Sequence, residues 1–471
     1  MQKYLLPVLA VASLIYACTN NNSDDATIAG STDSISNSFC ADTLHRSDLC
    51  AMLPYDINEK FQQGYTAILD PYIQPPFDVF SWQTFAYLNW PADANGRPLG
   101  DKIGGYPDTA RVWESYTDLA ELYGSDQTLL LHLNDAKKNN LKFFYMTSKS
   151  PFKLDSINGF QEADGNPLID RNLNFAVYDV KVNSVESQFI QKYNLTTKAG
   201  IDSFGSKHNN MLDLPASDAG KKNEGSMEIK TSWRILDTSK GDIPSRYYTR
   251  NAIIFVAANN STTGNAFTIK ATVGLVGMHI IRKTGKFNKW IWSTFEQVDN
   301  TPDDLQQAQM NQHPKIPWSF YDPASMGLQP GIPPPFQPGD SGTYKFDPVA
   351  PYAARYAVSV FGEASNHAVY GSQAQRVYPI YYRTQQLNRL WQNKLKGTVW
   401  ANYKLIGSQW TLGDPGIIKT PNVPSMLGNT TLETYMLNTA SCIGCHGAAS
   451  IVINKDTVKT DLSWMLALNA R

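Results

Sequence analysis

The sequence predicts an α+β protein with a central, antiparallel, β-rich body, flanking helices and a helical C-terminal segment. Two observations predict this class. Runs rich in β-branched and aromatic residues, separated by turn residues, fill the middle of the chain, and segments with the apolar spacing of helices stand on both sides of them. The composition agrees, because aromatic residues make up 12% of the chain and Pro and Gly are frequent, as in ordered, loop-rich globular proteins.

Length and charge limit the possible partners. With 471 residues the chain can bury a large core. Its formal net charge of -1 gives no reason to expect binding to nucleic acid or to a charged membrane surface. After the first 18 residues, no apolar run is long enough to cross a bilayer.

The N-terminus has the features of an export signal. Lys3 precedes an apolar run at residues 5–16, which is too short to be a comfortable membrane span. Ala17 before Cys18 resembles the lipobox of bacterial lipoproteins, so we predict a lipoprotein signal peptide at residues 1–18 and acylation of Cys18. The alternative is an ordinary signal peptide cut nearby, with Cys18 incidental. The prediction is an exported protein that is lipid-anchored to the bacterial cell envelope and faces the periplasm or the cell surface.

Three regions follow the signal. Residues 19–38 are mostly Ser, Thr, Asn and Asp, which predicts a disordered tether. Residues 39–425 are predicted to form the α+β body, and residues 426–471 a C-terminal segment packed on it. Cys40 and Cys50 are the two cysteines outside the signal and the C-terminal segment. In an oxidising compartment we expect them to form a disulfide, with two free thiols as the alternative.

Two helices are predicted before the strands. Residues 78–90 have apolar residues at helical spacing, with Asp78 as the N-cap and Pro91 after the last turn. Residues 109–123 have a similar pattern and stop at Gly124, a residue typical of helix ends.

Six strands and a hairpin are predicted in the middle of the chain. The strands have alternating or continuous apolar residues bounded by turn residues, and they cover residues 142–146, 174–182, 227–236, 252–257, 267–283 and 289–297. The turn at residues 283–286 predicts that the last two strands form a hairpin. An antiparallel sheet is therefore expected at the centre.

The last third of the chain is predicted to be irregular at first and then helical. Residues 301–351, rich in Pro, Gly, Gln and Asp, predict a long irregular excursion over the body. Helices are expected at residues 381–403, 430–438 and 461–470. Asp461 is the expected N-cap of the closing helix.

The C-terminal segment carries the strongest motif, Cys442-Ile443-Gly444-Cys445-His446. It reads C-x-x-C-H, the attachment signal of a c-type haem. Two thiols about one helical turn apart can each add to a vinyl group of the porphyrin, and the following imidazole binds the iron. A redox dithiol or half of a zinc site is the alternative, which the export signal and the lack of a second C-x-x-C disfavour. We predict one covalent haem c held by Cys442 and Cys445, with His446 on the iron.

The sixth iron ligand is left open by the sequence. Few residues follow His446, so part of the porphyrin wall must come from earlier chain. The candidate ligands are Met426, Met436, Met465, His279, His313 and His367. Met465 is the leading candidate because it is the only Met after the motif, although a Met is more often an ordinary core residue. An iron without a protein sixth ligand would leave an open site.

A weaker polar group lies on the predicted strands. It comprises Glu228, Lys230, Arg234, His279 and Glu296. If the strands pair, some of these side chains would converge on a polar pocket. A solvated face with cross-strand ion pairs is the favoured interpretation.

Several segments resemble a family of large exported single-haem proteins of the cytochrome c family type. The segments are FSWQTFAYLNWPAD, VGMHIIRKTG, WIWSTFEQVDN, LGNTTLETYML, SCIGCHGAAS and TDLSWML. The resemblance spans most of the chain after the tether and implies export, one covalent haem and a redox role, without a substrate. Family members often have His where Gln297 stands, so a role for that position is doubtful here.

The predicted function is that of an exported c-type cytochrome in electron transfer at the cell envelope, with a redox partner protein. The absence of Walker, G-x-S-x-G and H-E-x-x-H motifs favours this carrier. The alternative is a haem-dependent periplasmic oxidoreductase with an open iron site or a substrate pocket in the β body, which the large body favours. A haem-bearing binding or sensor lipoprotein is a third possibility.

Overall fold

The structure is a computed structural model in which the chain from Asp48 to Arg471 forms one compact unit. The residues that it describes are 49–57, 74–124, 127–145, 166–285, 289–304, 315–324, 331, 343–358, 364–411 and 422–471. The predicted signal peptide, the tether, Cys18 and Cys40 lie outside these ranges. Most of the irregular excursion predicted at residues 301–351 also lies outside them.

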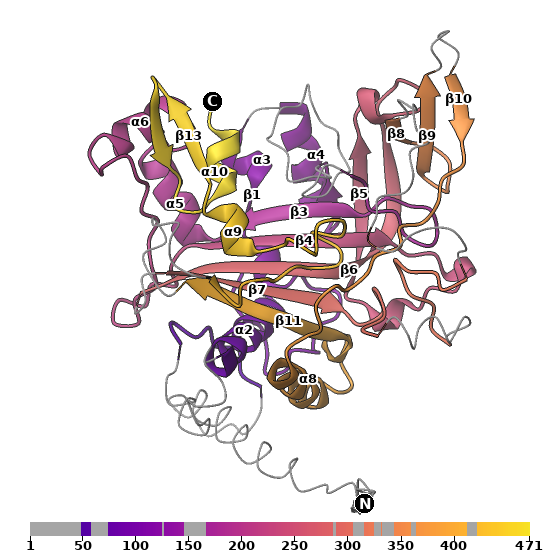
Figure 1. The fold of residues 1–471 in the computed structure, drawn as a ribbon, viewed down its shortest axis with the longest axis horizontal. Coiled ribbons are helices and arrows are strands. Elements are labelled where there is room, and N and C mark those ends of the chain that lie inside the picture. The colour runs from indigo at the N-terminus through magenta and orange to yellow at the C-terminus, as the bar shows by residue number, and fades with distance from the viewer. Residues whose placement is uncertain are drawn as a thin grey trace, which may run out of the picture. The chain divides into compact units, whose positions relative to one another are not determined.

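The fold is a mixed α+β fold built on a large, curled, mainly antiparallel sheet, as the sequence predicts (Figure 1). Seven strands follow one another in the order β1-β3-β4-β6-β7-β11-β12, and β5 pairs with β6 and with β2. The strands of this sheet are β1 (Thr117–Asp118), β2 (Lys142–Phe144), β3 (Val177–Val182), β4 (Met227–Ile235), β5 (Thr249–Val256), β6 (Phe267–Thr284), β7 (Lys289–Gln297), β11 (Tyr403–Thr411) and β12 (Asn422–Val423). The pair β2–β5 is parallel and the other pairs are antiparallel.

Two small sheets and a set of helices complete the described part of the chain. The small sheets contain β8 (Thr343–Phe346), β9 (Ala353–Val358) and β10 (Ala364–His367) in one, and β13 (Ser450–Ile453) and β14 (Asp456–Lys459) in the other. The α-helices are α2 (Gln74–Leu88), α3 (Leu119–Tyr123), α4 (Gln127–Lys138), α5 (Ser184–Lys192), α6 (Lys198–Gly205), α8 (Tyr382–Lys394), α9 (Cys442–His446) and α10 (Trp464–Asn469).

The predicted strands are confirmed with shifts of a few residues. Their β-branched and aromatic side chains suit a sheet that is buried on both faces. All nine residues of β4 are buried, for example. The predicted hairpin is also confirmed, because β6 and β7 pair antiparallel and Thr284 lies opposite Lys289.

The first predicted helix forms but begins earlier than predicted. Helix α2 starts at Gln74, with Pro75 and Pro76 in its first turn, where proline is tolerated because its missing N–H has no partner there. Asp78 is therefore not the N-cap. It lies one turn inside the helix and is 1% exposed.

The helix predicted at residues 109–123 is wrong over most of its length. The segment forms a 3₁₀ turn at Val112–Ser115, then β1 and the short helix α3. The side chain of Asp118 accepts a hydrogen bond from the Ala120 N–H, so a new helix begins there. Gly124 ends it with φ at 54°, as predicted.

The predicted C-terminal helices are also corrected. Residues 430–438 form turns, because Asn429 and Thr430 are hydrogen-bonded to Thr294 and Glu296 of β7, which set the path of the segment. The closing helix α10 is shorter than predicted and is capped by Ser463. Asp461 instead accepts hydrogen bonds from the Leu214 N–H and from Lys283 Nζ.

The helix predicted at residues 381–403 ends early. It stops at Lys394, a 3₁₀ turn follows at Val399–Asn402, and Tyr403 begins β11, a strand that the sequence pattern did not reveal. Helices α2 and α8 lie side by side against β11 (Figure 1). Their contact is aromatic, since the Trp82 ring stacks on Trp391 with centroids 5.5 Å apart.

The two faces of β7 have different neighbours. Ser293 is hydrogen-bonded to Ser81 of α2, 2.6 Å away, whereas Thr294 accepts a hydrogen bond from Asn429 of the C-terminal segment. Because successive residues of a strand point to opposite faces, α2 covers one face and the C-terminal segment covers the other. The segment that carries the C-x-x-C-H motif is thus part of the main body.

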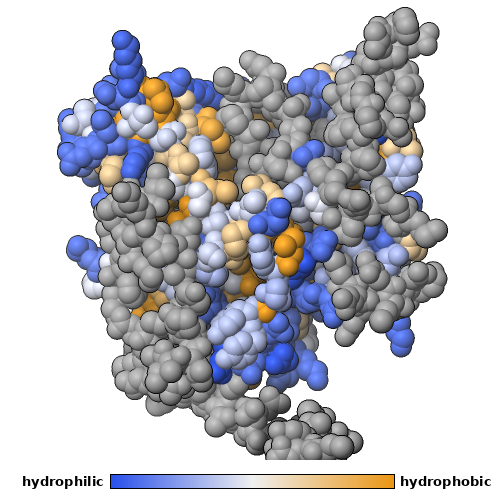
Figure 2. Space-filling view, viewed as in Figure 1, coloured by the Kyte–Doolittle hydropathy of each residue, from blue (hydrophilic) through white to orange (hydrophobic). Residues whose placement is uncertain are grey.

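The described surface is mixed in polarity. On the face in Figure 2 it is mostly hydrophilic, with apolar residues gathered mainly in the upper left corner, where Figure 1 shows β13 and α6. Val452 of β13 is 67% exposed. None of the helices in the described ranges combines the length and the apolar character that a membrane span requires.

Candidate haem-attachment site

The C-x-x-C-H motif folds as the single helical turn α9. The Ser441 hydroxyl caps it by accepting the Gly444 N–H at 3.2 Å. Gln409 of β11 fixes it to the sheet, because its Oε1 accepts the Ile443 N–H at 2.9 Å. Cys442 is half-buried and Cys445 is exposed. Residues three apart lie on the same side of a helix, so both thiols can reach one flat group.

The closing segment fixes the His446 ring. Its Nδ1 lies 2.7 Å from the Leu462 carbonyl oxygen, and since a carbonyl oxygen only accepts, Nδ1 must carry the proton. Nε2 is then left with its lone pair, as in a metal-binding histidine. The Trp292 ring lies edge-on to the imidazole, with centroids 5.5 Å apart. Trp464 Nε1 donates to the Cys445 carbonyl at 3.0 Å and ties the same segment to α9.

These residues fit a covalently bound haem. Two cysteines on one turn, followed by an imidazole whose Nδ1 donates to a backbone carbonyl, are the donor set that haem c requires. The zinc interpretation is disfavoured, because within the described ranges no three His, Cys, Asp or Glu side chains converge as ligands of one metal ion.

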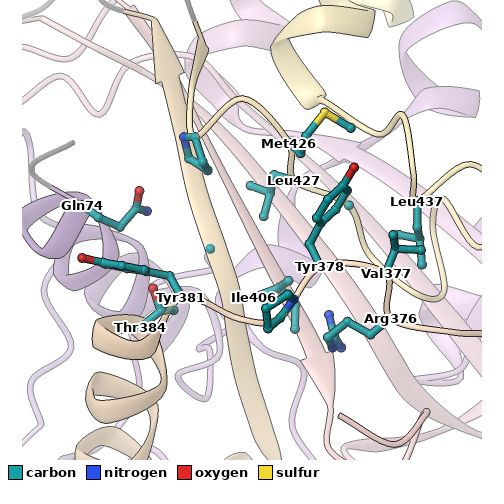
Figure 3. Close-up of a pocket in the computed structure, with 14 residues that line it drawn as sticks. Gln74, Arg376, Val377, Tyr378, Tyr381, Thr384, Ile406, Met426, Leu427 and Leu437 are labelled. Carbon is teal, nitrogen blue, oxygen red and sulfur yellow. The ribbon is translucent and has the colours of Figure 1, made fainter. Parts of the chain in front are cut away.

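A cavity of about 270 Å³ lies beside Cys442 at the β11 edge of the sheet (Figure 3). Ile406 and Leu427 pack against Cys442 and also line the cavity. The lining residues are Gln74, Arg376, Val377, Tyr378, Pro379, Tyr381, Thr384, Ile406, Gly407, Pro424, Met426, Leu427, Gly428 and Leu437. The walls of the cavity thus come from distant parts of the chain.

No protein-family model, curated protein or solved structure matches this chain.

The two ends of the cavity differ in chemistry. In Figure 3 the Tyr378 ring and Met426 lie near each other on one side, and Tyr381 and Thr384 lie on the other. Arg376 is buried in the wall and already paired. Its guanidinium is 2.5 Å from Glu296 and 3.0 Å from Asp303, two acidic partners that hold its pKa above its ordinary value.

The structure separates the candidate methionine ligands. Met465 is 7% exposed and packs in an apolar cluster with Ile443 and Leu466. It lies in the closing segment, whose Leu462 carbonyl is bonded to His446 Nδ1. Met426 is half-buried and lines the cavity. Met436 is half-buried and is not part of the cavity lining. Of the three candidate methionines, Met426 is the one that lines the cavity beside Cys442.

The candidate histidine ligands do not line the cavity or lie outside the described side chains. His279 is buried, and its Nε2 lies 3.3 Å from Glu433 Oε2. It therefore faces the chain that covers the sheet and does not line the cavity. His313 lies outside the described residues, as does the side chain of His367.

The polar group predicted on the strands is buried and does not form a single site. Glu228, Lys230, Arg234, His279 and Glu296 are all less than 9% exposed, so the interpretation as a solvated face is wrong. Each has its own neighbours, and several bind the chain that covers the sheet. These contacts are Arg234 with Asp170 and Asp242, His279 with Glu433, and Glu296 with Arg376 and the Thr430 N–H.

Sequence reasoning missed a pair of buried acids. Glu186 of α5 and Glu228 of β4 are 0% and 7% exposed and interact with each other. Burial, together with the second carboxyl, holds the pKa of Glu186 well above its ordinary range. The sequence of α5 gives no sign of this pair, because Glu228, the partner of Glu186, lies on a strand far along the chain.

Another buried carboxyl, that of Asp78, lies behind the cavity wall. It accepts hydrogen bonds from Gln74 Nε2 at 2.7 Å, Thr384 Oγ1 at 2.5 Å and Ser408 Oγ at 2.8 Å. Burial outweighs these bonds and raises the pKa of Asp78 to about 6.

The predicted disulfide is only partly described. Cys50 is disulfide-bonded. Its predicted partner, Cys40, lies outside the described residues, so the pairing stays a prediction.

Proposed function

We propose that this chain is an exported c-type cytochrome that carries one covalent haem and transfers electrons at the cell envelope. The observation that carries the proposal is the hydrogen bond from His446 Nδ1 to the Leu462 carbonyl. That bond orients the imidazole and fixes the proton on Nδ1, as in a metal-binding histidine, which an incidental C-x-x-C-H sequence would not require. A bound haem supplies one-electron chemistry.

Each residue has a defined part in this proposal. Cys442 and Cys445 hold the porphyrin by thioether bonds, and His446 provides the proximal ligand. Ile406 and Leu427 provide apolar wall beside Cys442. The exposed position of Cys445 leaves an edge of the site open to solvent, where a redox partner protein can approach.

The first test is covalent attachment. The exported protein should retain one haem per chain after denaturation and acid-acetone extraction, and Cys442→Ser with Cys445→Ser should lose it. Asn438→Ala is the matched control, because Asn438 is an exposed neighbour in the same segment and its replacement should leave the haem in place. Haem that extracts freely from the wild-type protein would refute the proposal.

A second candidate function is a haem-dependent periplasmic oxidoreductase. The cavity beside Cys442 favours it, because Tyr378 and Tyr381 offer hydroxyl groups to a small substrate there. The two functions differ in the sixth ligand. A Met-ligated carrier gives a low-spin spectrum with a near-infrared sulfur-to-iron band, which Met426→Ala should abolish and Met465→Ala should leave unchanged. A high-spin wild-type spectrum that shifts on adding cyanide would favour the oxidoreductase.

The location is part of the same proposal. Acylation of Cys18 would anchor the mature chain to the membrane by lipid. Cys18→Ala should therefore move the protein into the soluble fraction. A Cys18→Ala protein that stays in the membrane fraction would contradict anchoring through this residue.

A further inference from the structure

We propose that Asp78 is a redox-linked proton acceptor, which would take up one proton when a haem held beside the cavity by Cys442 is reduced by one electron and release it when that haem is reoxidised. The inference rests on the proposed haem site. It adds a proton to the electron transfer, so the protein would couple electron flow to the proton concentration of its compartment.

The surroundings of Asp78 carry the inference. The carboxylate is 1% exposed and is held by three neutral donors, Gln74, Thr384 and Ser408. Behind them lie further hydroxyls, since Ser81 Oγ is 2.6 Å from Ser408 Oγ. A buried carboxylate is expensive unless a cation offsets its charge.

No cation faces Asp78 within the described ranges. The elements packed around it present neutral groups: Gln74 and Ser81 from α2, Thr384 from α8, Ser408 from β11 and Ser293 from β7. The shift in its pKa comes first from burial and then from hydrogen bonds with Thr384, Gln74 and Ser408. The charged group of the cavity wall, Arg376, is already matched by Glu296 and Asp303.

Two of the three donors connect Asp78 to the cavity. Gln74 and Thr384 both line it and both bind the carboxylate (Figure 3). Asp78 therefore lies one side chain behind the wall. Because Asp78 is buried, a negative charge added on the other side of the Gln74 and Thr384 side chains would act strongly on its carboxylate. The electron thus disfavours the ionised carboxylate and favours its protonation.

The position of the equilibrium suits this role. Burial raises the pKa of Asp78 to about 6, so the carboxyl is mostly ionised near neutral pH before the electron arrives. A further rise on reduction brings its titration into the neutral range.

The proposed step is balanced. One electron would come from a redox partner protein and reduce the haem iron. One proton would come from solvent and neutralise the Asp78 carboxylate, which offsets the added negative charge. The Thr384 hydroxyl lines the cavity and donates to Asp78 Oδ2, which makes it the contact through which the proton arrives. When the electron passes on, the proton leaves by the same contact.

The test is the midpoint potential of the haem-loaded protein measured from about pH 5 to about pH 8, after covalent haem has been verified. For one proton per electron, the wild-type potential should fall by up to about 59 mV for each tenfold decrease in proton concentration. Asp78→Asn should flatten this dependence. Glu228→Gln is the control, because its acid lies in a different buried cluster, and it should keep the dependence.

The outcomes separate the two proposals. A protein without covalent haem fails the proposed function. A haem-loaded wild type whose midpoint potential does not change with pH refutes the role of Asp78. A pH dependence that survives Asp78→Asn and disappears in Glu228→Gln refutes it as well.

A second measurement covers the case in which Asp78→Asn does not fold. Redox-difference infrared spectroscopy of the wild type should show a carbonyl stretch of a protonated carboxylic acid gained on reduction. Thr384→Val removes one donor to Asp78 and should shift that band. The absence of the band in the wild type, or a band that Thr384→Val leaves unmoved, overturns the inference.

Discussion

Gly277 sets how closely the C-terminal segment approaches the sheet. It lies on β6, opposite Ser232 of β4. A Cβ atom built on Gly277 would be 2.2 Å from Thr431 Oγ1, 2.5 Å from Ser232 Oγ and 3.1 Å from Asn429 Oδ1. Gly277→Ala would therefore have to push the segment away from the sheet.

The expected cost follows from these contacts. Overpacking a buried site typically costs about 1–3 kcal/mol. The displaced segment would also weaken the hydrogen bond between Ser232 and Thr431, now 2.6 Å long, and the bond from Thr431 to Asn429, each worth about 1 kcal/mol. We expect Gly277→Ala to lower the free energy of unfolding by about 2–4 kcal/mol, a large part of a typical total of about 5–15 kcal/mol.

Urea denaturation measures this loss, and Gly220→Ala is the matched control. Gly220 lies in an exposed turn, where a Cβ atom would meet only the Asp218 carboxylate, at 3.3 Å, so that change should stay within about 0.5 kcal/mol. Thr431→Ala removes the nearest clashing atom. The double variant Gly277→Ala with Thr431→Ala should therefore lose less free energy of unfolding than the two single variants lose in sum, by at least about 1 kcal/mol. Strict additivity, or a harmless Gly277→Ala, would refute the close approach.

Three further predictions concern buried charges. Because burial raises the pKa of Asp78 from 3.8 to about 6, its contribution to stability is present below about pH 4 and is lost as the pH rises through about 6. The loss is about 3 kcal/mol, which denaturation at several pH values should detect in the wild type but not in Asp78→Asn. Because burial raises the pKa of Glu228 to about 7, Glu228→Gln removes a charge that the buried carboxyl takes on above that pH; the melting temperature should rise there, and an unchanged or lower value would contradict the cost of this buried charge. Arg234→Met leaves the buried Asp170 carboxylate without a cation, whereas Asp242 keeps its ion pair with Arg171; it should destabilise the fold by about 3–5 kcal/mol, measured by urea denaturation, and a loss below about 1 kcal/mol would contradict the pairing of Arg234 with Asp170.

The strands were predictable because their signal is local. β4, β6 and β7 have enough β-branched and aromatic residues to indicate strands without knowledge of their neighbours. The failed helix at residues 430–438 shows the limit of this approach. That segment contacts the sheet through Thr430 and Asn429, and these long-range contacts decide its path.

The polar residues of β4 show the same limit. Alternation along the strand indicated one polar face, which sequence reasoning assigned to solvent. The face is buried because a segment far along the chain covers it, with Thr431 bonded to Ser232. Nothing local to β4 reveals that cover.

The candidate site was predictable only in its covalent part. Cys442, Cys445 and His446 are adjacent in sequence, so their motif was visible at once. The carbonyl of Leu462 and the cavity behind Cys442 depend on folding of distant segments. Asp78 was misassigned as an N-cap because the two prolines before it concealed an earlier helix start.

The polar cover of the sheet has a consequence for biogenesis. The C-terminal segment follows the sheet in the chain and binds it largely through hydroxyl, amide and carboxylate groups such as Ser232, Thr294 and Glu296. While the segment is undocked, this part of the sheet exposes polar groups that water can hydrogen-bond. If the proposed function holds, we expect the body to tolerate this state while Cys442 and Cys445 are accessible for attachment of haem, and docking of the segment to follow attachment.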